Sequence, residues 1–459
     1  MNYIMDAFNW LIAAGATVML PVIITIVGLV FGLKITRSFK SGLTLGIGFA
    51  GIKLILDFMT TNVGPAAKAM VDRTGVHLTA LDVGWGSIAA VTWASPIIAI
   101  LIFVILLVNI VLLILKHTNT LDVDIWNYHH VAIVGVMVYF VTKNVWLGVG
   151  ASIVMALITF KLADWSQPMV EHFFGIPGVS LPTVSALSSL VIAWPLNWLL
   201  DKIPFFRKSK FSIRDAQKYL GFFGDSMIMG LIIGMVIGIL AGYNLTQVLQ
   251  LGVSMSAVLV LIPKMTSLFM EGLMPISEAA QKWSQKHFKG RKLFIGLDAA
   301  VVVGNQDVIT TALIIIPLTI AMALVLPGNQ VLPFADLAVV PFRVAMVVAL
   351  TNGNLLKNIV IGLVVTASLL WCGSSTAPVL TKLAKSVGIK VGSNSLLISS
   401  FAATSMIQSW LVYMAFTTHQ LILIPVLLIV FALVWYYFDG IKKVNAATND
   451  AAADTTAEN

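Results

Sequence analysis

The sequence predicts an all-α polytopic membrane protein, on the basis of two observations. Of its 459 residues, 59% are hydrophobic and only 10% are charged, whereas a soluble globular chain has about 25% charged residues. The apolar residues also form many separate runs, several of them about 20 residues long, which is the length that an α-helix needs to cross a membrane. Because such runs recur along the whole chain, we expect it to cross the bilayer repeatedly.

The apolar runs place the expected helices. We expect membrane spans near residues 9–33, 42–59, 84–115, 126–142, 145–162, 221–242, 246–263, 294–326, 335–350, 356–372 and 420–438. Two of these runs exceed one straight span and contain a proline, so we expect a break or kink at Pro96 and at Pro317. Segments 60–80 and 272–292 are amphipathic and charged, which is typical of helices that lie along a membrane surface.

The two halves of the chain resemble each other. Stretches of the first half recur in the second half in the same order, offset by roughly 210 residues. The pairs are 27–37 with 237–247, 51–59 with 262–270, Leu81-Asp82 with Leu297-Asp298, and 167–178 with 377–392. In the first pair, VGLVFGLKITR and IGILAGYNLTQ share two glycines and a threonine at matching positions. This ordered set predicts an internal duplication.

Charge distinguishes the two copies. The loop GLKITRSFK at 32–40 has three basic residues, whereas its counterpart GYNLTQVLQ at 242–250 has none. Because loops rich in Lys and Arg stay cytoplasmic, we expect the two loops on opposite sides of the membrane, so the repeats are predicted to be inverted. The N-terminus, with no basic residue before Lys34, is expected outside, and the C-terminus, with Lys442 and Lys443, in the cytoplasm.

The duplication and the charges together predict the organisation of the chain. We expect a first inverted repeat at 1–206, a second at 207–416, a final transmembrane helix at 417–440 and a disordered cytoplasmic tail at 441–459. Each repeat is expected to end in a re-entrant hairpin, which gives about eleven transmembrane helices in all. Inverted repeats with broken helices are typical of transporters, whose substrates bind where the backbone leaves the helix at membrane depth.

Polar residues within or beside the apolar runs are candidates for a substrate site, because a polar side chain at membrane depth lines a pathway or pairs with a partner. The candidates are Asn305, Gln306 and Asp307 in the run 294–326, Asn127 and His129 in DIWNYHH, Gln167, Glu171 and His172 in QPMVEHFFG, and Glu271 in FMEGLMP. Carboxamides donate and accept hydrogen bonds, which suits a substrate with many hydroxyl groups. For Asn305–Asp307 the alternative role is packing between helices. For Asn127 and His129 it is a place in the aromatic belt at the membrane interface, and for 167–172 it is an exposed cytoplasmic loop.

Neighbouring residues on a helix point about 100° apart, so we expect only one of His129 and His130 to face a cavity. No set of ligands with zinc-site spacing and no GxxxxGK[ST] motif occurs, so no metal, no cofactor and no ATPase activity are expected. Cys372 is the one cysteine, which excludes a disulfide framework within the chain. The net charge of +8 arises from basic loops, so it predicts membrane topology and no nucleic-acid partner.

The sequence resembles the membrane component, enzyme IIC, of the galactitol-type phosphotransferase system, within the ascorbate–galactitol group. The resemblance rests on stretches along the chain that include GPAAKAM (64–70), DVGWG (82–86), KLADW (161–165), IIGMVIGILAGY (232–243) and PGNQVLPFADLA (327–338). By position, the family's core site corresponds to DIWN with His129, to the hairpin entrance 167–175 and to the break at 304–307. Asn305 departs from the pattern, because similar proteins have a histidine after that glycine, and the hairpin 175–183 also differs.

The resemblance implies a homodimeric carrier in the bacterial inner membrane, with a core domain and a dimerisation domain of V-shaped helix pairs. The core would move in an elevator-type motion and present a substrate hydroxyl to the phosphocysteine of a partner IIB protein, which a IIA protein supplies. Whether the chain counts as an enzyme stays open, because the phosphoryl-carrying residue would belong to IIB. The expected substrate is galactitol or a related polyol or hexose. A proton- or sodium-coupled secondary sugar transporter is the alternative.

Overall fold

A computed structural model of the chain describes residues 16–30, 32–74, 78–93, 95–122, 124–208, 226–287, 293–333, 335–386, 397–401 and 405–457. The helices are α2 Ala16–Val30, α3 Ile35–Thr74, α4 Gly84–Trp93, α5 Ile98–Ile114, α6 Ile125–Thr142, α7 Val145–Phe174, α8 Val184–Lys202, α9 Pro204–Lys208, α11 Ser226–Leu240, α12 Leu245–His287, α13 Gln306–Val325, α14 Val340–Leu350, α15 Leu355–Ser386, α16 Ile407–Thr417 and α17 Gln420–Ala457. Two 3₁₀-helices are η2 Ala299–Val301 and η3 Ala335–Val339. The described residues also form six short strands, β1 Ala80–Asp82, β2 Thr120–Asp122, β3 Val179–Ser180, β4 Phe294–Gly296, β5 Val331–Leu332 and β6 Leu397–Ser399.

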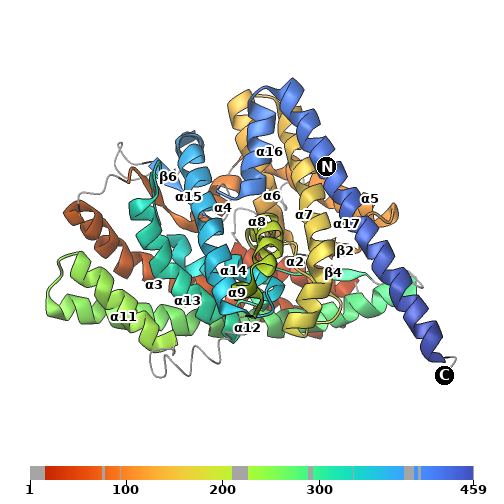
Figure 1. The fold of residues 1–459 in the computed structure, drawn as a ribbon, viewed down its shortest axis with the longest axis horizontal. Helices are drawn as coiled ribbons and strands as arrows, with labels where there is room; N and C mark the ends of the chain where they lie inside the picture. The colour runs from red at the N-terminus through yellow and green to blue at the C-terminus, as the bar shows by residue number, and fades with distance from the viewer. Residues whose placement is uncertain are drawn as a thin grey trace.

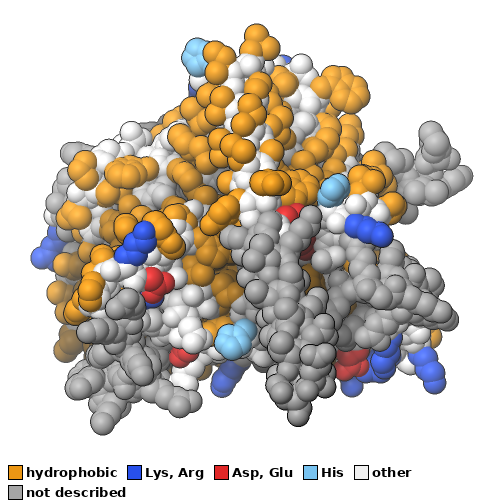
Figure 2. Space-filling model, turned by 45° about the vertical axis from the view of Figure 1, so that its right-hand side comes forward, with side chains coloured by type: hydrophobic (Ala, Val, Ile, Leu, Met, Phe, Trp, Pro, Cys, Tyr) orange, Lys and Arg blue, Asp and Glu red, His pale blue; other side chains and the backbone are white. Residues whose placement is uncertain are grey.

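The described helices suit a membrane environment. Five are long and apolar enough to cross a membrane, namely α7, α8, α13, α15 and the Gln420–Asp439 part of α17. Further apolar helical stretches of 10–17 residues lie in α5, α11, α12 and α14. Hydrophobic side chains cover the upper part of the face in Figure 2, while charged side chains lie mostly in its lower half. The mainly helical, polytopic character is confirmed, whereas the total of eleven spans stays a prediction.

Two helix pairs have matching turns. A turn at Gly32 joins α2 to α3, and a turn at Gly242 joins α11 to α12, with φ angles of 84° and 76°. In each turn the next residue donates its N–H to a helix carbonyl five residues earlier, at 2.9 Å for Leu33 and 3.0 Å for Tyr243. A left-handed residue at a helix end favours glycine, because glycine has no Cβ to clash. The two pairs pack through α3 and α12, beside α11 in Figure 1.

The structure shows where the predicted long runs are interrupted. The break expected at Pro96 is confirmed, since α4 ends at Trp93 and α5 begins at Ile98. At Pro317, where a break or kink was expected, the helix is not broken, because α13 continues through that proline. In the run 294–326 the chain becomes α-helical only at Gln306: β4 ends at Gly296, and Asp298 and Asn305 then cap the starts of η2 and α13.

Two other expectations about helix ends change. The amphipathic segments 60–80 and 272–292 are not separate helices in their described parts: they continue α3 to Thr74 and α12 to His287. The expected disorder at 441–459 is not seen over 441–457, because α17 continues to Ala457. After Gly440 the tail has many alanines and no glycine or proline, so the helix meets no residue that would end it.

Two small parallel sheets lie among the helices, in the orders β5-β1-β6 and β2-β4-β3. In each sheet the central strand comes from one half of the chain and both outer strands come from the other half. Leu81 of β1 lies opposite Leu332 and Ile398, while Ile295 of β4 lies opposite Leu121 and Val179. Because the strands of each sheet are parallel, their carboxyl ends share one edge. The all-α prediction misses these strands, since two or three residues are too few to show an alternating pattern.

Candidate functional site

Polar side chains gather at the carboxyl edge of the β2-β4-β3 sheet. Asp122 ends β2, Thr183 follows β3 and Asp298 follows β4. A helix begins within four residues of the end of each strand. The helix after β2 is α6, and its first turn brings Asn127 to the same edge. All four side chains are buried. We call Asp122, Asn127, Thr183 and Asp298 the Asp122 cluster.

Hydrogen bonds connect the Asp122 cluster across three segments of chain. Asn127 Nδ2 donates to Asp122 Oδ1 at 3.2 Å, and this bond sets the orientation of the amide. The Thr183 hydroxyl lies 3.1 Å from Asn127 Oδ1 and 3.3 Å from Asp298 Oδ2, and it accepts from the N–H of Ala299 at 2.7 Å. A hydroxyl has one proton, so Thr183 can donate to one of these two oxygens at a time. The other oxygen then receives no proton from Thr183.

Burial alters the acidity of this edge. Asp122 and Asp298 lie where strands end, outside the five spanning helices. Burial raises the pKa of Asp298 to about 6, while hydrogen bonds from Ala300 and Thr183 act in the opposite direction. Burial, together with the nearby carboxylate of Asp124, raises the pKa of Asp122 well above its usual value. Among the residues that the structure describes, no group of three or more His, Cys, Asp or Glu side chains is arranged to hold a metal ion.

The carboxyl edge of the β5-β1-β6 sheet has a different composition. The N–H of Asp336 donates to Asp82 Oδ2 at 2.8 Å, and Asp336 Oδ2 accepts from Ser400 Oγ at 2.6 Å and from the N–H of Phe401 at 2.7 Å. Arg343 of α14 is only 3% exposed, donates from Nη2 to the Asp336 carbonyl at 2.6 Å and lies 4.8 Å from the centre of the Phe401 ring. We call Asp82, Asp336, Arg343 and Ser400 the Asp336 cluster.

The two histidines of α6 lie together. The rings of His129 and His130 are both buried, with their centres 3.9 Å apart and their planes at 35°. The two side chains therefore do not diverge, while the expectation that only one of them faces a cavity stays a prediction. Rotation about the side-chain bonds brings the rings of neighbouring residues into contact, although their Cβ atoms point in different directions.

The three predicted residues at the start of α13 have separate environments. Asn305 caps the helix, since its Oδ1 accepts from the N–H groups of Asp307 at 2.9 Å and Val308 at 3.3 Å. Gln306 is exposed, and Asp307 is half-buried against the turn between α14 and α15, where a Cβ on Gly353 would lie 3.2 Å from Asp307 Oδ2. The hydrogen bonds that connect the Asp122 cluster involve none of the three.

The remaining predicted residues lie on α7 and α12. Gln167 is buried, and its Nε2 donates to Glu171 Oε2 at 2.7 Å. Glu171 and His172 are exposed near the end of α7, and Glu271 is exposed on α12. Of the predicted residues, the structure brings Asn127 to the Asp122 cluster and pairs Gln167 with Glu171.

Asp122, Thr183 and Asp298 are not among the site residues predicted from the sequence. A signal for Asp298 was present, since the Leu-Asp pair occurs in both halves, at 81–82 and 297–298. In the structure the aspartates of both pairs lie at or just beyond the carboxyl end of a central strand. Asp122 is also part of a Leu-Asp pair, at 121–122. Thr183 carries no comparable signal, because it meets Asp298 only through the exchange of strands.

Comparison with known proteins identifies the family. A family model described as the PTS system sugar-specific permease component matches residues 11–395. The galactitol-specific EIIC component of the PTS from Escherichia coli K12 is 37% identical over 388 residues, which cover 84% of this chain and 86% of that protein, and the component of the same name from Escherichia coli O157:H7 has the same values. The chain belongs to the sugar-specific permease family of the PTS.

A further relative of the permease, provisionally named a permease IIC component of Escherichia coli K12, is 36% identical over 399 residues, 87% of this chain and 91% of that protein. The permease is therefore a multi-pass inner-membrane component of sugar transport that works with IIA and IIB proteins. The resemblance on which the sequence analysis relied is confirmed.

Proposed function

We propose that the permease binds galactitol or a closely related polyol at the Asp122 cluster and presents one substrate hydroxyl to the phosphocysteine of its IIB partner. The hydrogen bonding of Thr183 is the observation that carries this proposal. One proton faces two buried acceptors, Asn127 Oδ1 and Asp298 Oδ2. A polyol has a hydroxyl on every carbon, so it can supply the donor that the unoccupied oxygen needs. Specificity for a hydroxyl-rich substrate follows, because a ligand without that donor leaves a buried acceptor unsatisfied.

The second hairpin contributes to the enclosure of this site. Thr183 lies at the tip of the hairpin formed by α7, β3 and α8. Gln408 of α16 is buried and donates from Nε2 to the Val184 carbonyl at 3.4 Å, next to Thr183. Elements from both halves of the chain therefore surround the tip of the first hairpin, which is the arrangement expected of a transporter site between repeats.

We further propose that the two halves are inverted repeats and that the permease works as a homodimer. The matching turns at Gly32 and Gly242 and the reciprocal exchange of strands support the repeats. The pairs α2–α3 and α11–α12 are the proposed dimerisation domain, and the elements around the two sheets are the core that moves in an elevator-type motion. The N-terminus is proposed outside and the C-terminus in the cytoplasm.

The start of α13 is a second proposed contact with substrate. Gln306 is exposed. Asn305 caps the helix through its amide oxygen, Oδ1. Asp307 lies beside them. Gln167, Glu171 and His172 are proposed to line the entrance near the end of α7, while Glu271, exposed on α12, is the most peripheral of the proposed residues.

One observation favours the alternative, a proton-coupled transporter: the pKa of Asp298 is raised to about 6 by burial, so this carboxyl group can exchange a proton near neutral pH. Uptake of labelled galactitol into membrane vesicles separates the two functions. We expect galactitol phosphate inside the vesicles only when phosphoenolpyruvate, IIA and IIB are all present. Accumulation of unmodified galactitol driven by a pH gradient alone would reject the proposal, and vesicles without the permease serve as the control.

A further inference from the structure

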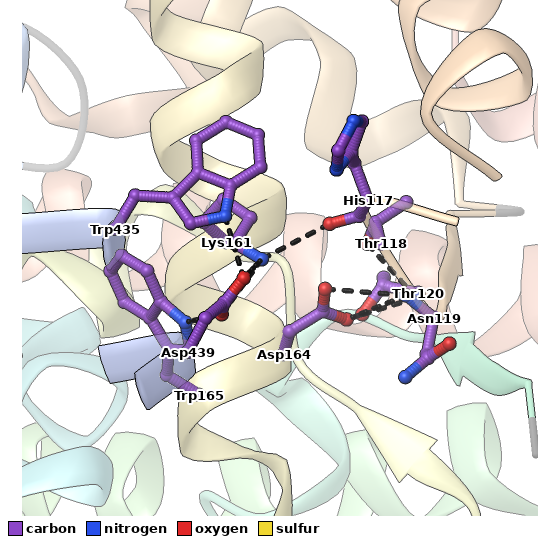
Figure 3. Close-up of polar contacts among 9 residues, drawn as sticks. All are labelled: His117, Thr118, Asn119, Thr120, Lys161, Asp164, Trp165, Trp435 and Asp439. Carbon is purple, nitrogen blue, oxygen red and sulfur yellow. Dashed lines mark hydrogen bonds and ion pairs between the residues drawn. The ribbon is translucent and has the colours of Figure 1, made fainter. Parts of the chain in front are cut away.

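The C-terminal helix is attached to the core at one place that has an unusual set of donors. α17 lies along α7 and α16 (Figure 1), and much of it is exposed, with Leu421 at 94%. At Asp439, however, its carboxylate accepts from Lys161 Nζ at 3.2 Å, from Trp165 Nε1 at 3.1 Å and from Trp435 Nε1 at 2.7 Å. We call Lys161, Trp165, Trp435 and Asp439 the C-terminal clasp. Figure 3 shows the two indoles and the lysine pointing at this carboxylate from α7 and α17.

Ring contacts reinforce the C-terminal clasp. Lys161 Nζ lies 4.5 Å from the centre of the Trp435 ring, a cation–π distance. Phe438 of α17 stacks on Trp165 with ring centres 4.8 Å apart and contacts Trp194 of α8 at 5.1 Å. The end of the apolar part of α17 therefore packs on α7 and α8. Lys161 is buried between α7 and α17, with its side chain only 5% exposed.

The clasp is connected to the strand that ends at Asp122. Lys161 Nζ also donates to the His117 carbonyl at 3.1 Å, three residues before β2 begins. One turn further along α7, the buried Asp164 accepts from the N–H groups of Asn119 at 3.1 Å and Thr120 at 3.0 Å, and from Thr120 Oγ1 at 2.9 Å. Because residues three apart share one face of a helix, Lys161 and Asp164 hold residues 117–120 against α7, as Figure 3 shows.

A second anchor fixes the other side of β2. Asn109 of α5 donates from Nδ2 to the Thr120 carbonyl at 2.9 Å and accepts from the N–H of Asp122 at 3.1 Å. The strand therefore lies between α5 on one side and α7 on the other. The Lys161 contact to the entry of β2 depends in turn on a carboxylate from α17, which comes after the family match ends at residue 395. The clasp therefore uses a helix outside the part of the chain that the family model matches.

We propose that Asp439 and Lys161 are positioning residues for substrate: the C-terminal clasp holds residues 117–122 in place and so sets the affinity of the Asp122 cluster. This inference rests on the proposed function, because it assumes that the Asp122 cluster binds the polyol. Neither residue touches the cluster. Loss of the clasp is expected to act through the position of β2, which brings Asp122 to Asn127.

Two measurements on the full-length permease in nanodiscs test the proposal. The first is the Kd for galactitol, and the second is hydrogen exchange of the amides of residues 117–122. For Asp439→Asn we expect faster exchange in this segment and an affinity lower by roughly fivefold, within the range by which contacts remote from a site alter binding. Asp439→Glu keeps the charge and is expected to restore most of both. The control Arg37→Ala breaks the exposed ion pair with Glu278, between α3 and α12, and should change neither.

Trp435→Phe is a milder second variant, which keeps an aromatic ring at this position but loses the N–H that donates to Asp439. It tests the clasp if Asp439→Asn does not fold. Wild-type affinity in a folded clasp variant, whether or not exchange rises, would overturn the positioning role. Unchanged exchange of residues 117–122 would overturn the mechanical link itself. If the wild-type permease binds no polyol, the proposed function fails separately, and the exchange data still decide whether the clasp holds this segment.

Discussion

The Asp122 cluster and the Asp336 cluster occupy the same kind of place, the carboxyl edge of a three-stranded parallel sheet, but they are built differently. At one edge the buried acids are accompanied by the guanidinium of Arg343, which lies near the carboxylates of Asp336 and Asp82. At the other edge, Asp122 and Asp298 are accompanied by the amide of Asn127 and the hydroxyl of Thr183. Two edges with the same architecture thus carry different chemistry.

The difference suggests that the two edges have different roles. A buried ion group with fixed hydrogen bonds joins its segments in one arrangement and is strongly disrupted when one partner is removed. A cluster of neutral donors beside acids, with one proton for two oxygens, can accept a ligand hydroxyl in place of an internal donor. We therefore interpret the Asp336 cluster as a structural joint and the Asp122 cluster as the place where substrate binds.

The largest effect is expected from Arg343→Met. It leaves the buried carboxylates of Asp336 and Asp82 without their cation, and breaking a buried ion group costs about 3–5 kcal/mol. We expect most of the folded protein to be lost, measured as the monodisperse fraction in detergent by fluorescence-detected size exclusion. Arg343→Lys keeps the charge and should retain more folded protein. Wild-type yield of the Met variant would contradict the structural role of Arg343.

The next effect separates the two edges by affinity. We expect Asn127→Ala to weaken galactitol binding by about 5- to 150-fold, because a buried polar group left without its partner costs about 1–3 kcal/mol. Titration calorimetry on the folded fraction measures this. Ser400→Ala is the matched control at the Asp336 cluster, where the hydroxyl donates to Asp336. It should lower the melting temperature and leave the affinity unchanged. If instead Ser400→Ala weakens binding and Asn127→Ala lowers only the melting temperature, the Asp336 cluster is the substrate site and the Asp122 cluster the structural joint.

A smaller effect tests the start of α13. Asn305→Ala removes the helix cap and should lower the free energy of unfolding by about 1 kcal/mol, whereas Asn305→Ser keeps a capping oxygen and should lower it much less. Thermal unfolding compares the two variants. The proposed second contact with substrate predicts that the Ser variant, although stable, binds galactitol more weakly. If a stable Ser variant binds galactitol with wild-type affinity, Asn305 only caps the helix and does not contact the substrate.

The smallest effect concerns pH. The pKa of Asp298 is raised from 3.8 to about 6 in the folded state, so the folded state binds the proton more tightly than the unfolded state. The contribution of this group to stability is therefore lost as the pH rises from about 4 to about 6. We expect the wild-type melting temperature to fall by about 2 °C more than that of Asp298→Asn between pH 4.5 and 6.5. If the melting temperatures of the two proteins change equally with pH, the raised pKa of Asp298 is contradicted.

Most helices and the interruption at Pro96 were predictable, because their signals are local. Long apolar runs and Pro96 anticipated the spans and one break, and family-like stretches such as PGNQVLPFADLA anticipated the family. The strands were not predictable, because each has only two or three residues and is defined by pairing across the two halves. Asp122, Thr183 and Asp298 therefore escaped selection, while Asn127 was found from its place at the start of a predicted span.

The central claim, that the polyol binds at the Asp122 cluster and not at its counterpart, is tested most directly by an experimental structure of the permease with galactitol bound. The measurement is the distance from each polyol oxygen to the side chains of the two clusters. We expect polyol oxygens at hydrogen-bonding distance, about 3 Å, from Asn127 and from at least one of Asp122 and Asp298. Galactitol bound at the Asp336 cluster, or only at the start of α13, would contradict the claim.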